Sequence, residues 1–246
     1  MQPKPLAIIA GVGSGLGSSL ARRFSKSYIV VLLARKAESY QPVLDEIKGS
    51  GGEAFGHNTD ISDPKSVKDA FSKIAEVYPT SQLAVAIFNA SGPFVRKSLL
   101  EVKVEEIDAG YGVSIRGALL FAQNAIPLLL AYSSSHPSSP PSLFFTGSTA
   151  AIKPNPLSSV ITVPRHGLRA LAMSTAKEFG PKGVHVVHSI VDGAIDTPWG
   201  EKFLKDKGEE EKIDPAAIAE MYWDAHLQGK RGWSNEIDCR ACGEKW

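Results

Sequence analysis

The chain alternates short apolar runs with longer segments in which apolar residues recur every three or four positions. Apolar runs bounded by glycine or polar residues are typical of strands buried on both faces. Such runs predict strands at residues 6–10, 28–34, 53–57, 83–88, 143–146 and 184–191, with a strand-like segment at 236–238. Helical spacing and helix-start signals predict helices at residues 18–27, 41–48, 63–78, 105–132, 164–179 and 214–227. This alternation predicts an α/β fold in which a parallel sheet of about seven strands carries helices on both faces.

The first apolar run ends at a glycine-rich turn, Gly11 to Gly17, and a helical segment follows directly. Glycines permit a sharp turn and close approach of a ligand, and the free N–H groups and dipole at a helix N-terminus favour a phosphate. Ligands of doubly wound parallel sheets bind beyond the C-terminal strand ends. Six predicted strand ends carry polar or glycine-rich positions, which are Gly11–Gly17, Arg35, Asp60, Asn89, Ser148 and Asp192. The pattern therefore predicts a Rossmann-type sheet that binds a dinucleotide.

Composition and charge narrow the class of protein. With 246 residues, 43% of them hydrophobic, the chain has the size of a single domain, which we place at residues 1–246. Its formal charge of +1 argues against nucleic-acid and anionic-membrane partners, and no apolar run approaches the ~20 residues that cross a bilayer. The first apolar run has no cleavage-like end, so we expect no signal peptide and a cytoplasmic protein. No predicted helix N-terminus lies beside Cys239 and Cys242, so we expect neither a redox nor a metal site there.

Motifs at the strand ends resemble those of the short-chain dehydrogenase/reductase family over essentially the whole chain. The Gly-x-x-x-Gly-x-Gly of Gly11, Gly15 and Gly17 resembles the family's cofactor turn, with Ala10 in place of the usual threonine. The other similar segments are Asp60, Phe88-Asn89-Ala90-Ser91, Ser114-Ile115-Arg116-Gly117, Gly147-Ser148 and the helical stretch from Leu168 to Val186. More narrowly, a fungal subgroup is similar in two segments, which are Asp192 to Asp196 and the Glu-Lys-Trp terminus.

The resemblance implies a nicotinamide cofactor along this edge of the sheet. The cofactor-binding residues that it implies are Gly11, Gly13, Ser14, Gly15, Leu16, Gly17, Arg35, Lys36, Asp60, Ile61, Asn89, Ala90, Ser91, Arg165, Gly193, Ile195 and Thr197. After the second strand, a carboxylate would accept the ribose 2′-hydroxyl of NAD, whereas an arginine pairs with the 2′-phosphate of NADP. Because Arg35 and Lys36 stand there, we expect NADP(H). The alternative is that Arg35 is a solvated charge at the strand end.

The family's catalytic residues are only partly present. Members of the family reduce a ketone with a tyrosine acid, a lysine four residues later, a serine thirteen residues earlier and an asparagine. The corresponding positions in this chain, in the same order, hold Ile161, Arg165, Ser148 and Ser114. Isoleucine cannot donate a proton, and arginine holds a ribose or an anion without titrating near neutrality. Neither Tyr111 nor Tyr132 has the required spacing, and His166 should point to another helix face. The usual ketone reduction should therefore be impaired.

Three functions are compatible with this set of residues. The first, which we favour, is hydride transfer to an activated acceptor such as an iminium, which needs no proton. Its candidate catalytic groups are Ser148, Arg165, Ser114, Asp192 and Arg116, followed by Asp108 and Asp196. For the charged candidates, turn-shaping, surface or dimer-contact roles are the alternatives. The second function is cyclisation, isomerisation or a pericyclic reaction in fungal secondary metabolism, and the third is a non-catalytic nucleotide-binding scaffold.

The resemblance also implies how the substrate is covered and how chains assemble. Residues 193–228 correspond to the family's mobile substrate lid, in which Thr197 would contact the nicotinamide carboxamide. Trp199 and Phe203 would either cover a flat small-molecule substrate or pack the lid onto the body. Family members usually dimerise or tetramerise through two long helices, which correspond here to about residues 111–130 and 158–180. We therefore expect a homodimer or homotetramer.

Overall fold

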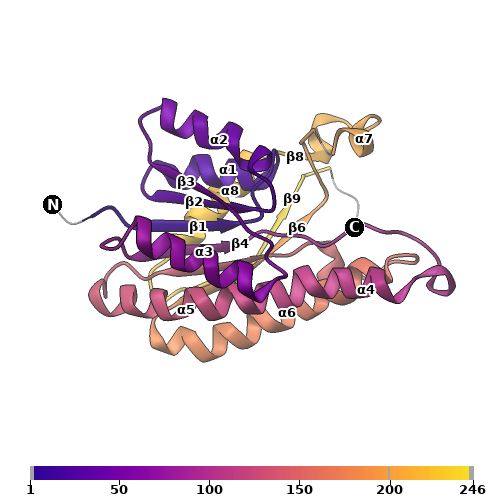
Figure 1. Cartoon of the computed structure of the whole chain (residues 1–246). Coiled ribbons are helices and arrows are strands. Elements are labelled where there is room, and N and C mark those ends of the chain that lie inside the picture. The colour runs from indigo at the N-terminus through magenta and orange to yellow at the C-terminus, as the bar shows by residue number, and fades with distance from the viewer. Residues whose placement is uncertain (1–2, 199, 244–246) are drawn as a thin grey trace.

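A computed structural model of the chain describes residues 3–198 and 200–243. Its centre is a seven-stranded sheet in the order β3-β2-β1-β4-β5-β6-β9, in which neighbouring strands are parallel (Figure 1). These strands are β1 (Leu6–Ala10), β2 (Ile29–Ala34), β3 (Ala54–Asn58), β4 (Leu83–Phe88), β5 (Ser142–Thr146), β6 (His185–Asp192) and β9 (Glu236–Arg240). The predicted α/β class and the parallel sheet of about seven strands are confirmed.

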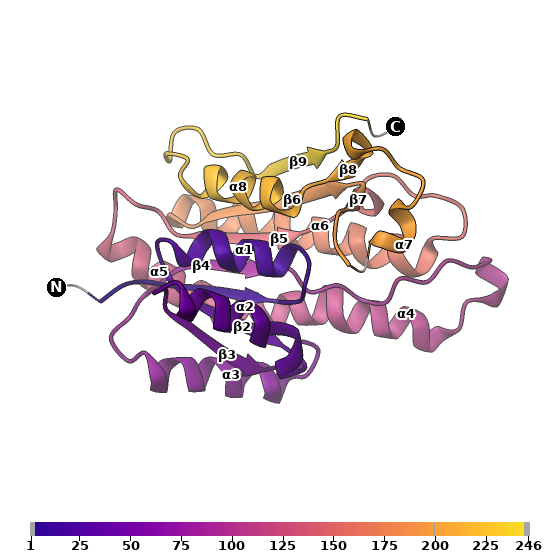
Figure 2. The same cartoon turned by 90° about the horizontal axis from the view of Figure 1, so that it is seen from above.

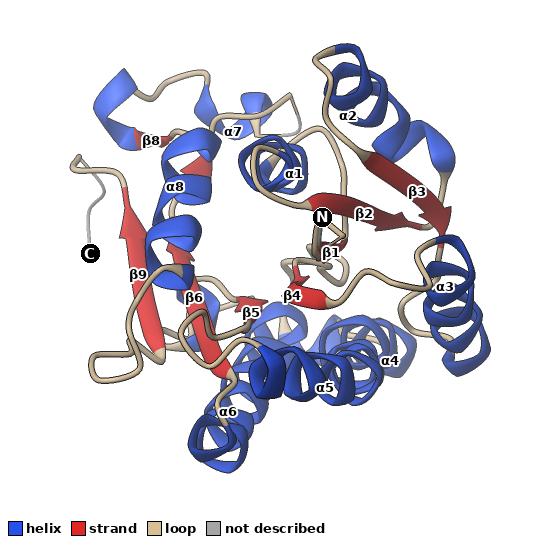
Figure 3. Cartoon of the chain, turned by 90° about the vertical axis from the view of Figure 1, so that its left-hand side faces the viewer, coloured by secondary structure: helices blue, strands red, loops and turns tan. Residues whose placement is uncertain are grey.

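Helices cover both faces of this sheet, as Figure 3 shows end-on. On one face lie α1 (Leu16–Ser25), α2 (Ala37–Gly49) and α8 (Pro215–His226). On the other lie α3 (Pro64–Val77), α4 (Val104–Tyr111), α5 (Ala118–Ser135) and α6 (Ser159–Phe179). Each buried strand contributes side chains to two hydrophobic cores, one on each face of the sheet, because successive side chains point to opposite faces. In β1, Ala7 and Ile9 pack with α1, α2 and α8, whereas Ile8 and Ala10 pack with α3, α5 and α6.

The parallel register brings the C-terminal strand ends to one edge of the sheet. Ala10 of β1 is paired with Phe88 of β4 and with Leu33 of β2, and Thr146 of β5 is paired with Ser189 of β6. The segments that follow these strands therefore meet at that edge. Beyond it, Figure 2 shows the short pair β7 (Ala194–Ile195) and β8 (Lys212–Ile213) together with α7 (Glu201–Leu204). The edge and these elements frame the candidate site.

The long helices differ from the sequence expectation at their beginnings. Helix α6 begins at Ser159, five residues before Pro164, where the sequence predicts its start. Proline normally interrupts a helix because it lacks an N–H and crowds the preceding turn. Here Gly110 of α4 packs against this turn, where an added Cβ would lie 3.0 Å from Pro164 Cγ and 3.2 Å from the Val160 carbonyl oxygen. Packing against α4 therefore covers a turn that the low helix propensity of proline would otherwise unwind. As a consequence, Ile161 and Arg165 lie on the same helix.

The expected helix at residues 105–132 is divided into α4, a π-helical stretch at Gly112–Gly117, and α5. Together they form a helical stretch, Val104–Ser135, that is long and apolar enough to cross a membrane by length and composition. The sequence expectation concerned continuous apolar runs, whereas this stretch meets the criterion by its length and its mean hydropathy. Core helices of soluble proteins pass the same test, and α5 buries Phe121, Ala125 and Leu129 in the core beneath the sheet.

A buried histidine joins α8 to the opposite, N-terminal edge of the sheet. His226 Nε2 lies 2.7 Å from the Tyr28 hydroxyl, and its Nδ1 lies 2.8 Å from Ser142 Oγ. Burial, with a smaller effect of the nearby His185, lowers the pKa of His226 to about 4. The folded chain therefore holds this imidazole in its neutral form well below the pH at which an unfolded chain would protonate it.

We expect this histidine to make the fold sensitive to acid. The unfolded state binds a proton below pH 6.5, whereas the folded state does not until about pH 4, so stability falls as the pH falls between these values. Between about pH 7.5 and about pH 5 the loss at this site should be about 2 kcal/mol. Urea unfolding at both pH values measures it. In the His226→Gln variant, the loss of unfolding free energy between the two pH values should be smaller by about 2 kcal/mol. The control variant His166→Gln changes an exposed histidine and should show the same loss as the unaltered protein. Equal losses in the two variants would contradict the assignment to His226.

Candidate functional site

The glycine turn between β1 and α1 packs its backbone directly on the neighbouring strand end. Gly11 has a φ of +92°, and a Cβ there would lie 2.5 Å from the Ala90 nitrogen. A Cβ on Gly17 would lie 2.7 Å from the Gly11 carbonyl oxygen, so neither position accepts a side chain without displacing backbone. Gly13 has open space where its side chain would project. The turn is therefore packed tightly on the side of Gly11 and Gly17 and open on the side of Gly13, at the N-terminus of α1. An open backbone turn at a helix N-terminus is the geometry that a pyrophosphate requires.

A cavity of about 870 Å³ opens at this edge of the sheet. Its wall combines the glycine turn, the loops after β4 and β5, the start of α6, and the segment after β6. The predicted site residues that line it are Gly11, Gly13, Gly15, Leu16, Gly17, Asn89, Ser91, Ser148, Arg165, Asp192, Gly193, Ile195 and Thr197. Asn89 also donates from its side-chain nitrogen to the Gly11 carbonyl at 2.9 Å, which fixes the turn to β4. The structure thus brings the predicted cofactor and catalytic residues of four strands into one space.

The other predicted residues lie outside the cavity wall. They are Ser14, Arg35, Lys36, Asp60, Ile61, Ala90, Ser114 and Arg116, and the further candidates Asp108 and Asp196 also lie outside it. Two hydrogen bonds from Ser62 lower the pKa of Asp60, and the charges of Arg35 and Arg116 lower it further. Arg116 therefore lies near Asp60, on the side where the resemblance places adenine, which separates it from the other catalytic candidates. Ser114 is buried under Gly92.

At the centre of the cavity, α6 presents Ile161 and Arg165 one turn apart. Arg165 is half-buried, donating from Nη1 to the Thr146 carbonyl at 2.8 Å and from Nη2 to Ser91 Oγ at 2.6 Å. Burial lowers its pKa to about 10, so the guanidinium stays charged at neutral pH. Among the described lining residues there is no tyrosine, histidine, cysteine or glutamate. No phenol of the described residues therefore lines the cavity with Ile161, and the nearby Tyr222 is fully buried, with its hydroxyl 2.8 Å from Thr146 Oγ1.

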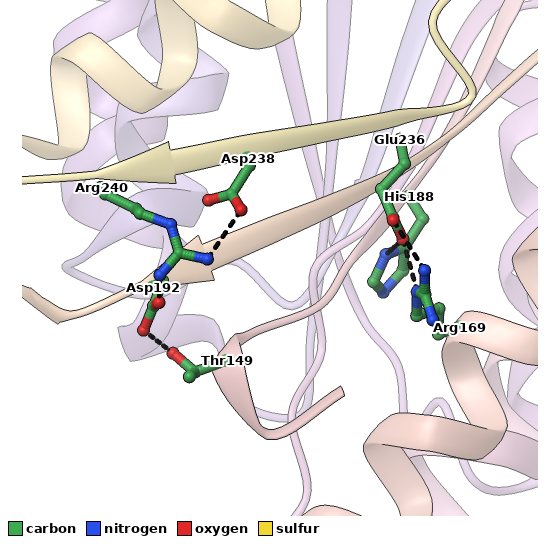
Figure 4. Close-up of polar contacts among 7 residues, drawn as sticks. All are labelled: Thr149, Arg169, His188, Asp192, Glu236, Asp238 and Arg240. Carbon is green, nitrogen blue, oxygen red and sulfur yellow. Dashed lines mark hydrogen bonds and ion pairs between the residues drawn. The ribbon is translucent and has the colours of Figure 1, made fainter. Parts of the chain in front are cut away.

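Asp192, at the end of β6, is held by residues that the sequence did not single out (Figure 4). Thr149 donates its hydroxyl to the carboxylate, and Arg240 of β9 forms an ion pair with it. Arg240 also pairs with Asp238 at 2.7 Å. The register of β6 and β9 places Asp192 directly beside Arg240, a partnership 48 residues apart in the chain. The carboxylate is thus buried on the wall with its charge balanced.

A second polar cluster fixes β9 to α6 behind the cavity floor (Figure 4). His188 is fully buried, and its Nδ1 lies 3.0 Å from a Glu236 carboxylate oxygen that also accepts from Arg169 at 2.6 Å. Burial lowers the pKa of His188, although Glu236 opposes this effect. The imidazole lies against Gly147, where a side chain would collide with it. A glycine is therefore required beside Ser148, and this cluster lies directly against the cavity wall at Gly147.

The segment after β6 reaches back over the glycine turn. A Cβ on Gly15 would lie 3.1 Å from Thr197 Cγ2, so the Thr197 side chain packs closely on the turn at Gly15. β7 and β8 pair to brace this segment, and the Asp196 amide donates to the Ile213 carbonyl at 2.8 Å. Of the predicted lid residues, Trp199 lies outside the described residues, as does the side chain of Phe203.

The parallel sheet, the glycine turn and the cavity at the C-terminal strand ends define a Rossmann-type fold. The family described as short chain dehydrogenase matches residues 5–208, and the chain belongs to this family.

Three similar proteins illustrate the relationship. An uncharacterised oxidoreductase of Staphylococcus aureus is 27% identical over 236 residues, 96% of each chain. A metagenomic short-chain oxidoreductase in complex with NADP is 23% identical, with a TM-score of 0.79 over 96% of this chain and 97% of that one. A 3-ketoacyl-(acyl-carrier-protein) reductase from Brucella melitensis, complexed with NADH, is 23% identical, with a TM-score of 0.83 over 99% of each. The class is thus an oxidoreductase whose structural neighbours bind NADP or NADH. The fungal likeness stays a prediction, and its Glu-Lys-Trp segment lies outside the described residues.

Proposed function

We propose that this chain is an NADP(H)-dependent reductase that transfers hydride to an activated acceptor such as an iminium. The observation that carries the proposal is Ile161, which lines the cavity one turn before Arg165, where the resemblance implies the tyrosine acid. A ketone would lack its proton donor there, whereas an iminium carbon needs the hydride alone. In this proposal the chain is a divergent, fungal-type member of its family with an incomplete catalytic set.

The residues of the cavity suit a dinucleotide. The open space at Gly13 and the start of α1 on the wall would receive the pyrophosphate, because the helix N-terminus presents free N–H groups. Arg35 and Lys36, both exposed at the end of β2, would pair with the 2′-phosphate that distinguishes NADP. Arg165 would hold the nicotinamide ribose. When bound, the reduced nicotinamide supplies the hydride.

The remaining polar residues divide into two groups in this proposal. Ser148 lines the cavity near Arg165 and orients the acceptor. Asp192 shapes the wall, because its charge is balanced by Arg240. Ser114 supports the loop after β4 from beneath Gly92, and Arg116 belongs with Asp60 at the adenine end. Only Ser148 then contacts the acceptor, and Arg165 contacts the nicotinamide ribose.

The test is a comparison of acceptors with NADPH and purified protein, followed by absorbance at the nicotinamide band. We expect NADPH oxidation with cyclic imines and little or none with ketones or unsaturated carbonyls. Oxidation with unactivated ketones at comparable rates would overturn the proposal. Conversion of a substrate without NADPH consumption would favour the cyclase or isomerase alternative. Cofactor binding without turnover of any of these would favour the nucleotide-binding scaffold.

Assembly, lid and location complete the proposal. The outer surface of α4, α5 and α6 exposes large apolar side chains, which are Tyr111, Leu119, Leu128 and Val163. Such a surface supports a homodimer or homotetramer through these helices, and a monomeric mass in light scattering would overturn it. Residues 193–228, which frame the cavity at the strand ends, would act as the lid of one domain spanning residues 1–246. We propose a small-molecule substrate, no nucleic-acid or membrane partner, and a cytoplasmic location.

A further inference from the structure

The charges on the cavity wall are predominantly positive. Among the described lining residues, the groups that carry charge are Arg96, Lys153, Arg165 and Asp192. The one carboxylate in this set, Asp192, already forms an ion pair with Arg240, which does not line the cavity. Three cations therefore face the cavity with no lining carboxylate left to balance them.

Arg165 is the innermost of these cations. Both of its described hydrogen bonds go to neutral acceptors, the Thr146 carbonyl and Ser91 Oγ. No carboxylate of the described residues forms an ion pair with it, and burial disfavours its charged form. A desolvated charge without a counter-ion is costly, and an anion nearby removes much of that cost. The inner cavity therefore favours a ligand that brings negative charge.

Arg96 and Lys153 lie farther along the wall, on the loops that follow β4 and β5. These loops are joined by a hydrogen bond from the Lys97 amide to the Leu157 carbonyl at 3.0 Å. Within residues 3–198 and 200–243, neither the Arg96 nor the Lys153 side chain has a hydrogen bond or an ion pair, and both residues are exposed. By contrast, the adjacent Lys97 is paired with Glu106 at 2.6 Å. The side chains of Arg96 and Lys153 are thus available to bind a ligand, whereas Lys97 is already ion-paired with Glu106.

We infer that the hydride acceptor carries a carboxylate, and that Arg96 and Lys153 bind this group. The inference rests on the proposed function, which calls for an iminium acceptor. A cationic iminium alone would be repelled by Arg165, whereas an imino acid brings its own negative charge and is neutral overall. The cofactor does not account for these two cations, because its phosphates would lie at the glycine turn and at Arg35. The substrate class is therefore a cyclic imine carboxylate.

The first experiment compares two imines that differ by the carboxylate. With saturating NADPH, 1-piperideine-2-carboxylate should give a kcat/KM about 10- to 100-fold above that of 1-piperideine, as a charge-assisted contact predicts. The double variant Arg96→Gln/Lys153→Gln should reduce this ratio to within about threefold. The matched control, Lys68→Gln/Arg231→Gln, removes the same charge from exposed residues that do not line the cavity and should keep the ratio. A ratio near one in the unaltered protein, or one that survives in the first variant, would overturn the inference.

The second experiment separates this inference from the proposed reaction. Calorimetry of the NADP⁺-saturated protein measures binding of pyrrole-2-carboxylate and of pyrrole-2-carboxamide, planar probes that accept no hydride. The carboxylate should bind at least about tenfold more tightly, and the Arg96→Gln/Lys153→Gln variant should lose this preference. If no imine is reduced but the preference is present and depends on the two cations, the proposed function fails and the carboxylate site stands. No detectable preference for the carboxylate overturns the site.

Discussion

Replacing Ile161 by tyrosine and Arg165 by lysine together is expected to create ketone reductase activity about 10²- to 10⁴-fold above that of the unaltered chain. The pair lies one turn apart on α6 and faces the same cavity as Ser148, so the new phenol would meet the acceptor and the lysine would lie behind it. The positive charge of the lysine ammonium lowers the pKa of the nearby phenol. An arginine at this position would also lower the phenol pKa, but it holds its own proton too firmly to pass one on. NADPH oxidation with a panel of ketones measures the gain.

The matched control is Ile161→Phe/Arg165→Lys, which fills the same space without a hydroxyl. It should gain no ketone reduction, although it should still bind NADPH in a fluorescence titration. Equal activity in the two double variants would show that the proton comes from elsewhere in the site. An inactive tyrosine variant that binds NADPH normally would show that Ile161 does not occupy the position of the acid.

The second large effect is expected at the end of β2. Arg35→Glu should weaken NADPH binding about 100-fold or more, because it removes a charge-assisted pair with the 2′-phosphate and places a carboxylate beside that phosphate. NADH binding should strengthen, since the new carboxylate can accept the ribose 2′-hydroxyl. Fluorescence titration with each cofactor gives the two dissociation constants. Arg35 is exposed, so the fold should tolerate the change.

A reversal of charge elsewhere on the same layer provides the control. Lys48→Glu alters an exposed residue in the last turn of α2 and should leave the ratio of NADPH to NADH affinity unchanged. If Arg35→Glu leaves that ratio unchanged as well, Arg35 is a solvated charge and the choice of cofactor is made elsewhere.

The strands could be predicted well because each is an apolar run buried on both faces. The Leu6–Ala10 and Leu83–Phe88 strands have the predicted bounds, and the others differ by one or two residues at one or both ends. The ends of the helices could not be predicted equally well. Proline within a sequence normally signals a break in a helix, but α2 and α6 continue through Pro42 and Pro164. Pro164 lies inside α6 because Gly110 of a neighbouring helix covers the turn before it.

In the site, local motifs were sufficient for groups that follow a strand directly, such as the glycine turn, Asn89 and Ser148. They were insufficient where the partner comes from a distant strand. Nothing near Asp192 in the sequence signals that Arg240 will balance its charge, because the two residues end strands, β6 and β9, whose pairing the sequence did not predict. Likewise, the side chain of Arg116 lies near Asp60 instead of on the cavity wall, a direction that spacing along a helix does not specify.

The position of β9 has a consequence for the order in which this molecule is completed. Its residues, 236–240, pair with β6 and supply both Arg240 to Asp192 and Glu236 to His188. During synthesis on a ribosome, the preceding 235 residues must be made before these partners exist. Until then β6 has an unpaired edge, the Asp192 carboxylate lacks its ion-pair partner, and the His188 imidazole lacks its hydrogen-bond partner. The cavity wall is therefore incomplete until β9 has been made, and we expect a nascent chain stalled before β9 to be a target for chaperones and proteases.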